Sequence, residues 1–292
     1  MPETPIQKYH LHKNEPEKLQ FEVYPLKEFL IENAAHTQKP HVHSYYQIIW
    51  FKDGMGQHRV DFETYKVKAN SLFFISKGQI HHFDENYPDG FIIHFNASFI
   101  DYSETFTEVF MKHNIFHSFE KEPLFKIKEK DRDILLNIVL QMQEEVKNPN
   151  QFGHREYMKV LLHLFLILTQ RLGVREKSGE LSMNNPSHIL LVRFQKLLEE
   201  SFFEIHTVFE YAALLNVSAK TLTNCTRENL QQTPLEIINE RITLEAKRLL
   251  TYSDKNVSEI AYQLGFSDAS NFVKFFKRNT QIAPRDFRKA VS

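Results

Sequence analysis

Near the end of the chain, one short stretch combines hydrogen-bond donors with an aromatic stripe. Asp268 is a typical N-cap, and at 100° per residue the helix that follows it carries phenylalanine on one side and polar donors on the other. The apolar side consists of Phe272, Phe275 and Phe276, and the donor side of Ser270, Lys274, Lys277 and Arg278, with Asn271 at its edge. Arginine and asparagine pair with base edges, and lysine contacts phosphates. The stretch therefore predicts a helix with a buried face and an exposed face that suits a nucleic acid.

The same pattern occurs earlier, in 207–229. Thr207 and Glu210 predict a capping box, and Asn216 occupies the position of Gly265, where the first helix of the later copy ends. For that later copy, Val257 and Ser258 are expected to be the hydrophobic staple and the N-cap. Leu222, Cys225 and Thr226 then match the three phenylalanines, and Lys220, Asn224 and Arg227 match the donors. We interpret the repeat as a duplicated helix-turn-helix.

A basic face on a single helix is usually only solvated surface, but its repetition in the same local context favours a binding surface. Cys225 on the buried side is more often a small hydrophobic residue than a redox sensor. We predict that the following residues contact DNA: Ser218, Lys220, Thr221, Asn224, Arg227, Asp268, Ser270, Asn271, Lys274, Lys277 and Arg278.

The two copies are joined by 234–253, which has the apolar periodicity of one long amphipathic helix. Such a helix spans roughly 25 Å, so the two donor faces can lie about one DNA turn, ~34 Å, apart. The net charge of the chain is only -1. Residues 272–292, however, contain six basic residues and one acidic residue, Asp286, so the positive charge is local.

The first half of the chain has a different composition, with short β-branched and aromatic runs at 43–51, 58–67, 70–75 and 90–96. Such runs predict an antiparallel sandwich or small barrel. Helical periodicity follows at 131–146 and 155–172, and the leucines of 161–168 suit either an intradomain core or a dimer interface. We expect a barrel in 1–128, a helical packing and dimerisation segment in 129–172, a linker in 173–186, and a DNA-binding domain in 187–292 with units at about 207–229 and 257–279.

Several classes of protein are excluded by composition. The single cysteine rules out an intramolecular disulfide framework and suits a cytoplasmic protein. No apolar run approaches the length of a membrane span, and the first ten residues lack the apolar segment of a secretory signal.

The second half resembles the AraC/XylS family of bacterial transcription regulators. The resemblance lies in a motif that is met by Ala261, Leu264, Gly265, Phe266, Asp268, Ser270, Phe272, Phe276, Lys277, Arg278, Pro284, Phe287 and Arg288. The chain departs from the family pattern at Thr226, Lys274 and Gln281, where phenylalanine, arginine and glycine are usual.

The first half resembles the cupin-like effector domain of such regulators, in "PHVHSYYQIIWFKDGMG" and "LFFISKGQIHHF". The resemblance implies an α+β protein of two domains, an antiparallel β-barrel with two following helices and an all-α tandem helix-turn-helix domain. His41, His43, Gln47 and either His81 or His82 occupy positions that resemble the metal-binding set of catalytic cupins. Because residues two apart on a strand point to the same side, His41 and His43 can both face the barrel interior.

Three interpretations of these polar groups stay open: a small-molecule pocket, a metal site, and histidines that merely hydrogen-bond in a polar barrel mouth. A carboxamide at position 47 is a poorer metal ligand than a carboxylate, so no metal or other cofactor is assigned. The residues expected to bind an effector are His41, His43, Tyr45, Gln47, Trp50 and His82, with Tyr46 and Phe74 as further aromatic lining.

The resemblance implies a ligand-responsive activator with no enzymatic activity that binds double-stranded DNA as a homodimer and acts with RNA polymerase and a small-molecule effector. The alternative is a metal-dependent cupin enzyme fused to a DNA-binding module.

Overall fold

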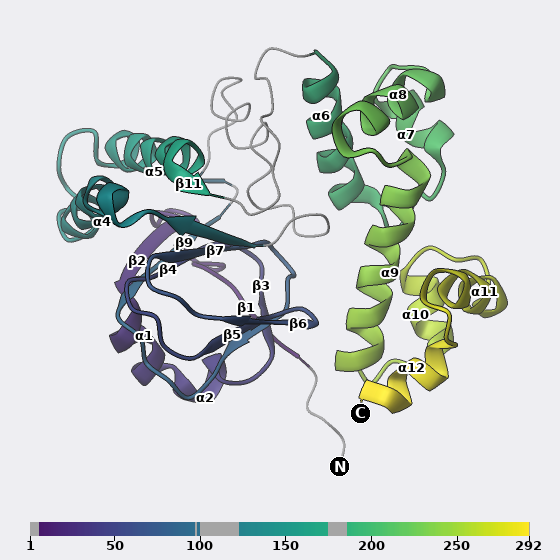
Figure 1. Cartoon of the computed structure of the whole chain (residues 1–292), viewed down its shortest axis with the longest axis horizontal. Coiled ribbons are helices and arrows are strands. Elements are labelled where there is room, and N and C mark those ends of the chain that lie inside the picture. Colours follow the sequence, from purple (N-terminus) through teal and green to yellow (C-terminus); the bar gives the residue numbers. More distant parts are fainter. Residues whose placement is uncertain (1–5, 97, 100–122, 175–185, 292) are drawn as a thin grey trace. The chain divides into compact units, whose positions relative to one another are not determined.

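The computed structural model describes residues 6–96, 98–99, 123–174 and 186–291. The contacts divide the chain into two compact units, one within 7–179 and one containing the described residues from 186 onward (Figure 1). Most of the predicted linker, 175–185, lies outside the described residues. Among the described helices, none is both long and apolar enough to cross a membrane.

The first unit is built from two sheets. Their strand orders are β1-β3-β8-β5-β6 and β11-β10-β7-β4-β9-β2, and the β1–β3 pair is parallel whereas the other pairs are antiparallel. The strands are β1 Gln7–Tyr9, β2 Phe21–Pro25, β3 His41–His43, β4 Tyr46–Phe51, β5 Gln57–Val60, β6 Glu63–Lys66, β7 Ser71–Ile75, β8 His81–Phe83, β9 Gly90–Phe95, β10 Leu124–Ile127 and β11 Gly173–Val174. The helices are α1 Leu26–Glu32, α2 Ala34–Thr37, the 3₁₀ turn η1 Glu129–Asp131, α4 Arg132–Val146 and α5 His154–Leu172.

The single strand predicted at 58–67 is wrong, because this segment forms the hairpin of β5 and β6. Val60 pairs with Glu63, and Asp61 between them has a φ of 53°. Aspartate tolerates this left-handed conformation, so the turn forms without the glycine or proline that would have marked it in the sequence.

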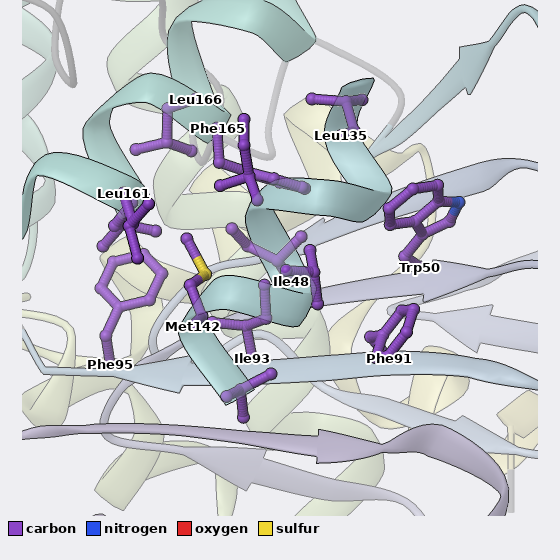
Figure 2. Close-up of a cluster of buried hydrophobic side chains, with 14 of the residues drawn as sticks. Ile48, Trp50, Phe91, Ile93, Phe95, Leu135, Met142, Leu161, Phe165 and Leu166 are labelled. Atoms are coloured by element: carbon purple, nitrogen blue, oxygen red, sulfur yellow. The ribbon is translucent and has the colours of Figure 1, made fainter. Parts of the chain in front are cut away.

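The strand β4 divides the core of this unit between its two faces. Ile48 and Trp50 point toward α4 and α5, where they meet Met142 and Phe165 (Figure 2). Ile49 and Phe51, which alternate with them along the strand, point between the two sheets. The helices predicted at 131–146 and 155–172 are confirmed, and they cover one face of the sheet, which leaves the opposite face to line the barrel interior.

The second unit is entirely helical. Its helices are α6 Pro186–Ser201, α7 Val208–Leu214, α8 Ala219–Leu230, α9 Pro234–Tyr252, α10 Val257–Gln263, α11 Ala269–Thr280 and α12 Pro284–Val291. In Figure 1, α9 runs between the α6–α8 group and the α10–α12 group. The long helix predicted at 234–253 is therefore confirmed.

Two arginines attach the helices on both sides to α9. The guanidinium of Arg241, which is 5% exposed, donates from Nε to both carboxylate oxygens of Glu199 in α6 at 3.0 Å. It also lies 3.8 Å from the ring centroid of Phe202. Near the C-terminal end of α9, Arg288 of α12 donates from Nε to the carbonyl oxygen of Leu250 at 2.9 Å. These contacts make α9 the common support of both groups.

The two turns between the paired helices use the same backbone conformation with different residues. Gly265 has a φ of 78° and Asn216 has a φ of 56°, as the duplication predicted. At Gly265 the main chain of a neighbour is also very close, since an added Cβ would lie 2.2 Å from the carbonyl oxygen of Phe203.

Gly265→Ala should lower the free energy of unfolding of the helical unit by about 2–4 kcal/mol, from the left-handed backbone and the overlap with a backbone oxygen. Asn216→Gly is the matched control at the equivalent turn, and it should change stability by less than about 1 kcal/mol. Urea denaturation followed by circular dichroism measures both. An equally small decrease in the free energy of unfolding of both variants would contradict the close approach at Gly265.

Candidate nucleic-acid interface and effector pocket

Side-chain caps fix the start of the two helices that carry the donor faces. The Ser218 hydroxyl accepts from the backbone N–H of Thr221 at 3.0 Å at the start of α8. The Asp268 carboxylate accepts from the backbone N–H of Asn271 at 2.8 Å at the start of α11. Both residues were predicted to contact DNA, and in the structure their side-chain oxygens cap and position the two helices.

The preceding helices are capped in a similar way, with one correction. Thr207 caps α7 and accepts from the backbone N–H of Glu210 at 3.3 Å, which is one half of the predicted capping box. Among the described contacts, the carboxylate of Glu210 does not accept from the backbone N–H of Thr207 in return. The assignment of Ser258 as N-cap of α10 is wrong, because Asn256 is the cap and shares a capping box with Glu259. Asparagine is as good a cap as serine, and the helix begins two residues earlier than the sequence pattern suggested.

The predicted donor residues are exposed on both helices. On α8 they are Lys220, Thr221, Asn224 and Arg227, and on α11 they are Ser270, Asn271, Lys274, Lys277 and Arg278. Within the part of the chain that the structure describes, no ion pair holds the basic groups of α11. The amide of Asn271 is engaged, since its Nδ2 donates to Asp268 at 2.6 Å.

The opposite sides of the same two helices are buried. Phe272 and Phe276 are completely buried, and so are Leu222 and Thr226. Thr226, where the family usually has phenylalanine, donates its hydroxyl to the carbonyl of Thr223 at 3.3 Å, so its polar atom is paired. The prediction that Phe275 belongs to the core holds only in part: it is half-buried against Phe266, with ring centroids 5.1 Å apart.

The cysteine of α8 behaves as a buried structural residue. The Cys225 thiol is 3% exposed and donates to the carbonyl oxygen of Ser187 at 2.9 Å. Burial raises the pKa of this thiol. Because a reactive cysteine needs a lowered pKa and access to solvent, the structure favours the packing role.

The first unit contains a cavity of about 190 Å³ inside the barrel. Of the predicted effector-binding residues, His41, His43, Tyr45 and Gln47 line it. The remaining lining residues are Tyr9, His10, Leu11, Glu22, Tyr24, Phe29, Asn33, His36, Thr37, Phe83 and His94.

Trp50 does not line this cavity, and the prediction is wrong. The side chains of β4 alternate, so Gln47 points into the barrel while Trp50 packs against Phe91 and Phe165 on the helix-covered face (Figure 2). The same alternation places Phe74 of β7 among the residues of that outer core, and Tyr46 packs against it.

Of the two adjacent histidines, His81 lies beside His43 in the barrel interior, and His82 does not. His81 is completely buried, and its Nε2 lies 2.9 Å from Nε2 of His43. His82 follows it on β8 and is half-buried on the other side of the strand, paired in register with Arg59 of β5. A strand of three residues carries no periodic signal that would have distinguished the two.

Burial controls the charge of the histidines in the barrel. It lowers the pKa of His41 to about 4 and the pKa values of His43 and His81 well below the usual histidine value. All three imidazoles are therefore neutral at pH 7, with a lone pair on one ring nitrogen.

A further polar group that sequence analysis missed lies at the cavity wall. The carboxylate of Glu22 in β2 lies 3.9 Å from Nδ1 of His94, whose Nε2 is 2.8 Å from the amide nitrogen of Gln47. Burial opposes ionisation of Glu22, but the donors His94 and Tyr24 outweigh it and lower the pKa of this carboxyl. The alternation of "FEVYP" could have indicated the strand, whereas its pairing with β9 was not visible.

Comparison with known proteins agrees with both units. Residues 211–290 match a family model described as a helix-turn-helix domain, and residues 26–101 match one described as an AraC-like ligand binding domain. The HTH-type transcriptional activator RhaS of Salmonella schwarzengrund (strain CVM19633) is 30% identical over 131 residues, which is 45% of each chain. This match thus spans less than half the length of that curated relative. RhaS of Enterobacter sp. (strain 638) is 20% identical over 251 residues, covering 85% of this chain and 87% of that protein.

Solved structures give weaker likenesses. ToxT from Vibrio cholerae O395 is 14% identical with a TM-score of 0.40, and the match covers 94% of this chain and 99% of that one. The DNA-binding domain of AdpA in complex with a target DNA is 27% identical with a TM-score of 0.32, covering 37% and 93%.

The described fold is that of a two-domain α+β regulator, with a β-sheet domain and helices followed by a helix-turn-helix domain. The second half of the chain thus matches a helix-turn-helix domain and the first half an AraC-like ligand binding domain, in agreement with the expected resemblance to AraC-type regulators. These matches are to domains and relatives named as transcription regulators, which agrees with the expectation that the chain is not an enzyme.

Proposed function

We propose that this protein binds double-stranded DNA through α8 and α11 and activates transcription in response to a small molecule bound in its barrel. The observation that carries the proposal is the pair of exposed donor faces on helices that share one support, α9. With 19 residues, α9 is about 28 Å long, which suits two recognition helices in adjacent major-groove segments.

The donor faces divide into base-reading and phosphate-contacting residues. Lys220, Thr221, Asn224 and Arg227 would read the first groove segment, and Ser270, Asn271, Lys274 and Arg278 the second. Asn271 would first have to exchange its bond to Asp268 for one to a base. Lys277 would contact phosphate, a role that adds affinity without sequence preference.

The effector would be a small polar molecule. Aromatic rings of Tyr9, Tyr24 and Tyr45 together with the amide of Gln47 offer stacking surfaces and hydrogen bonds. The described residues that line the cavity include the carboxylate of Glu22 but no lysine or arginine. This favours an uncharged or cationic ligand over an anionic one.

The activating role rests on the relatives, whose names describe transcriptional activators. Activation would involve contact with RNA polymerase at a promoter in the cytoplasm.

We further propose that the protein is a homodimer through α5. Tyr157, Val160 and Leu164 follow one another at i, i+3 and i+7, so they form one stripe along the helix. Val160 is 60% exposed and Leu164 is 42% exposed in the single chain, although the helix also buries six side chains against the barrel. An exposed apolar stripe of this kind is typical of an interface between copies.

Selection of random duplex DNA by the full-length protein, followed by sequencing, tests the DNA-binding proposal. At near-physiological salt we expect enrichment of two short motifs whose centres are about 10 base pairs apart. Arg227→Ala should relax base preference at one position, by about 1–3 kcal/mol, whereas Lys277→Ala should weaken binding to all sequences alike.

Lys130→Ala removes the same charge from an exposed site in the first unit and serves as the matched control. It should leave both affinity and preference unchanged. No enrichment with either the full-length protein or residues 187–292 alone would overturn the proposal. If Arg227→Ala and Lys277→Ala lost affinity and base preference to the same extent, their separate roles would be contradicted.

The dimer proposal predicts that Leu164→Glu dissociates the protein, because a charge in an apolar interface is strongly unfavourable. Sedimentation velocity should change from a dimer to a monomer at micromolar concentration. Gln151→Glu adds one negative charge at an exposed position before α5 and should remain dimeric. A monomeric unaltered protein, or a dimeric Leu164→Glu variant with unchanged affinity, would exclude this interface.

A further inference from the structure

Three buried imidazoles converge inside the barrel of the first unit. His41 and His43 lie two apart on β3, so both point inward, and His41 is the cross-strand partner of His81 on β8. One ring nitrogen from each of the three residues lies within 4.8 Å of the other two. Each of the three residues is at most 4% exposed.

The hydrogen bonds around this group leave a lone pair on Nε2 of His41 and allow one on Nε2 of His81. Nδ1 of His41 lies 2.8 Å from the carbonyl oxygen of Lys39 and donates to it, so Nε2 carries the lone pair. Nδ1 of His81 lies 3.0 Å from Nε2 of His58. When His81 donates in that contact, its own Nε2 also becomes a lone pair, facing Nε2 of His43. Metal-binding histidines in proteins are oriented by the same kind of bond from the second ring nitrogen.

The separations also fit a small metal ion. For zinc–nitrogen bonds of about 2.0–2.1 Å in a tetrahedron, two ligand nitrogens are roughly 3.3 Å apart. The distance of 2.9 Å between Nε2 of His43 and Nε2 of His81 is slightly shorter than this value. The largest separation within the group of three, at most 4.8 Å, is longer than it. Modest ring rotations therefore suffice to place all three nitrogens at the bonding distance.

The fourth position is open to the cavity. Gln47 is not part of the group, because its amide nitrogen is 2.8 Å from His94. His41 and His43 line the cavity, and so does Tyr9, which pairs in register with His43. The Tyr9 hydroxyl is buried and has no hydrogen-bond partner among the described residues, so it is available to a water or ligand there. Three protein ligands and one exchangeable position are a common arrangement around zinc.

We propose that His41, His43 and His81 bind one divalent transition-metal ion, with Zn²⁺ the best match, at the wall of the effector cavity. Imidazole sets of this kind suit zinc, copper, iron and nickel, whereas magnesium and calcium prefer oxygen ligands. The ion would join β3 to β8, and its open position would offer a contact for an effector. The proposal does not rest on DNA binding.

The experiment uses the full chain without an affinity tag, freed of metal by a chelator and titrated with Zn²⁺ or Co²⁺. Plasma mass spectrometry should find one ion per chain after dialysis, and the thermal midpoint should rise on loading. His41→Asn and His43→Asn should each weaken the affinity at least about tenfold. The matched control is His82→Asn on the same strand as His81, which should bind as the unaltered chain does.

Titration of the unaltered chain against a competing chelator keeps the proposal testable even when a buried variant does not fold. Substoichiometric binding by the folded, unaltered chain would overturn it. So would affinity that falls equally in His82→Asn and His43→Asn. Selection of DNA by the metal-free protein separates the two proposals, because failure of metal binding leaves DNA recognition unaffected.

Discussion

The rigid helix α9 is the constraint on which the account of the helical unit depends. The apolar side of α9 contacts the helices of both groups. A salt bridge from Arg241 holds α6, and a backbone bond from Arg288 holds α12. Because a 19-residue helix resists bending, the length of α9 sets the separation of α8 and α11. Each recognition helix needs only a local donor face, which explains how a chain of net charge -1 can be proposed to bind DNA.

In the barrel unit, the alternation of side chains along each strand separates packing from chemistry. On β4, Trp50 and Ile48 seal the sheet against α4 and α5, while Gln47 points toward the histidines and Glu22. The apolar core between the sheet and the two helices therefore supports the strand, while its side chains contribute nothing to the polar lining of the cavity. The cavity, the proposed metal ligands and the exposed stripe of α5 lie in this one unit, so effector binding and the proposed dimer contact share a single scaffold.

How far the sequence predicted this structure depended on the length of each pattern. The periodicity of α5, α9 and α11 extends over three or more turns, and the duplication located both helix pairs and the left-handed turns at Asn216 and Gly265. The family usually has glycine where Gln281 stands, and Gln281 has a φ of 66°. By contrast, β1, β3 and β8 have three residues each, too few to reveal which side chain points inward. Long-range pairing decided between His81 and His82, and no local signal encodes such pairing. Trp50 differs, because it lies three residues after Gln47 on β4, so strand alternation alone places the two side chains on opposite faces.

In the proposed complex, the helices α8 and α11 on the common support α9 read one face of a duplex. Hydroxyl-radical footprinting of the protein on a selected DNA site measures this most directly, because it maps the protected backbone at single nucleotides. We expect two protected patches per protomer on the same face, with centres about 10 base pairs apart. A single patch per protomer, or two patches on opposite faces of the duplex, would contradict it.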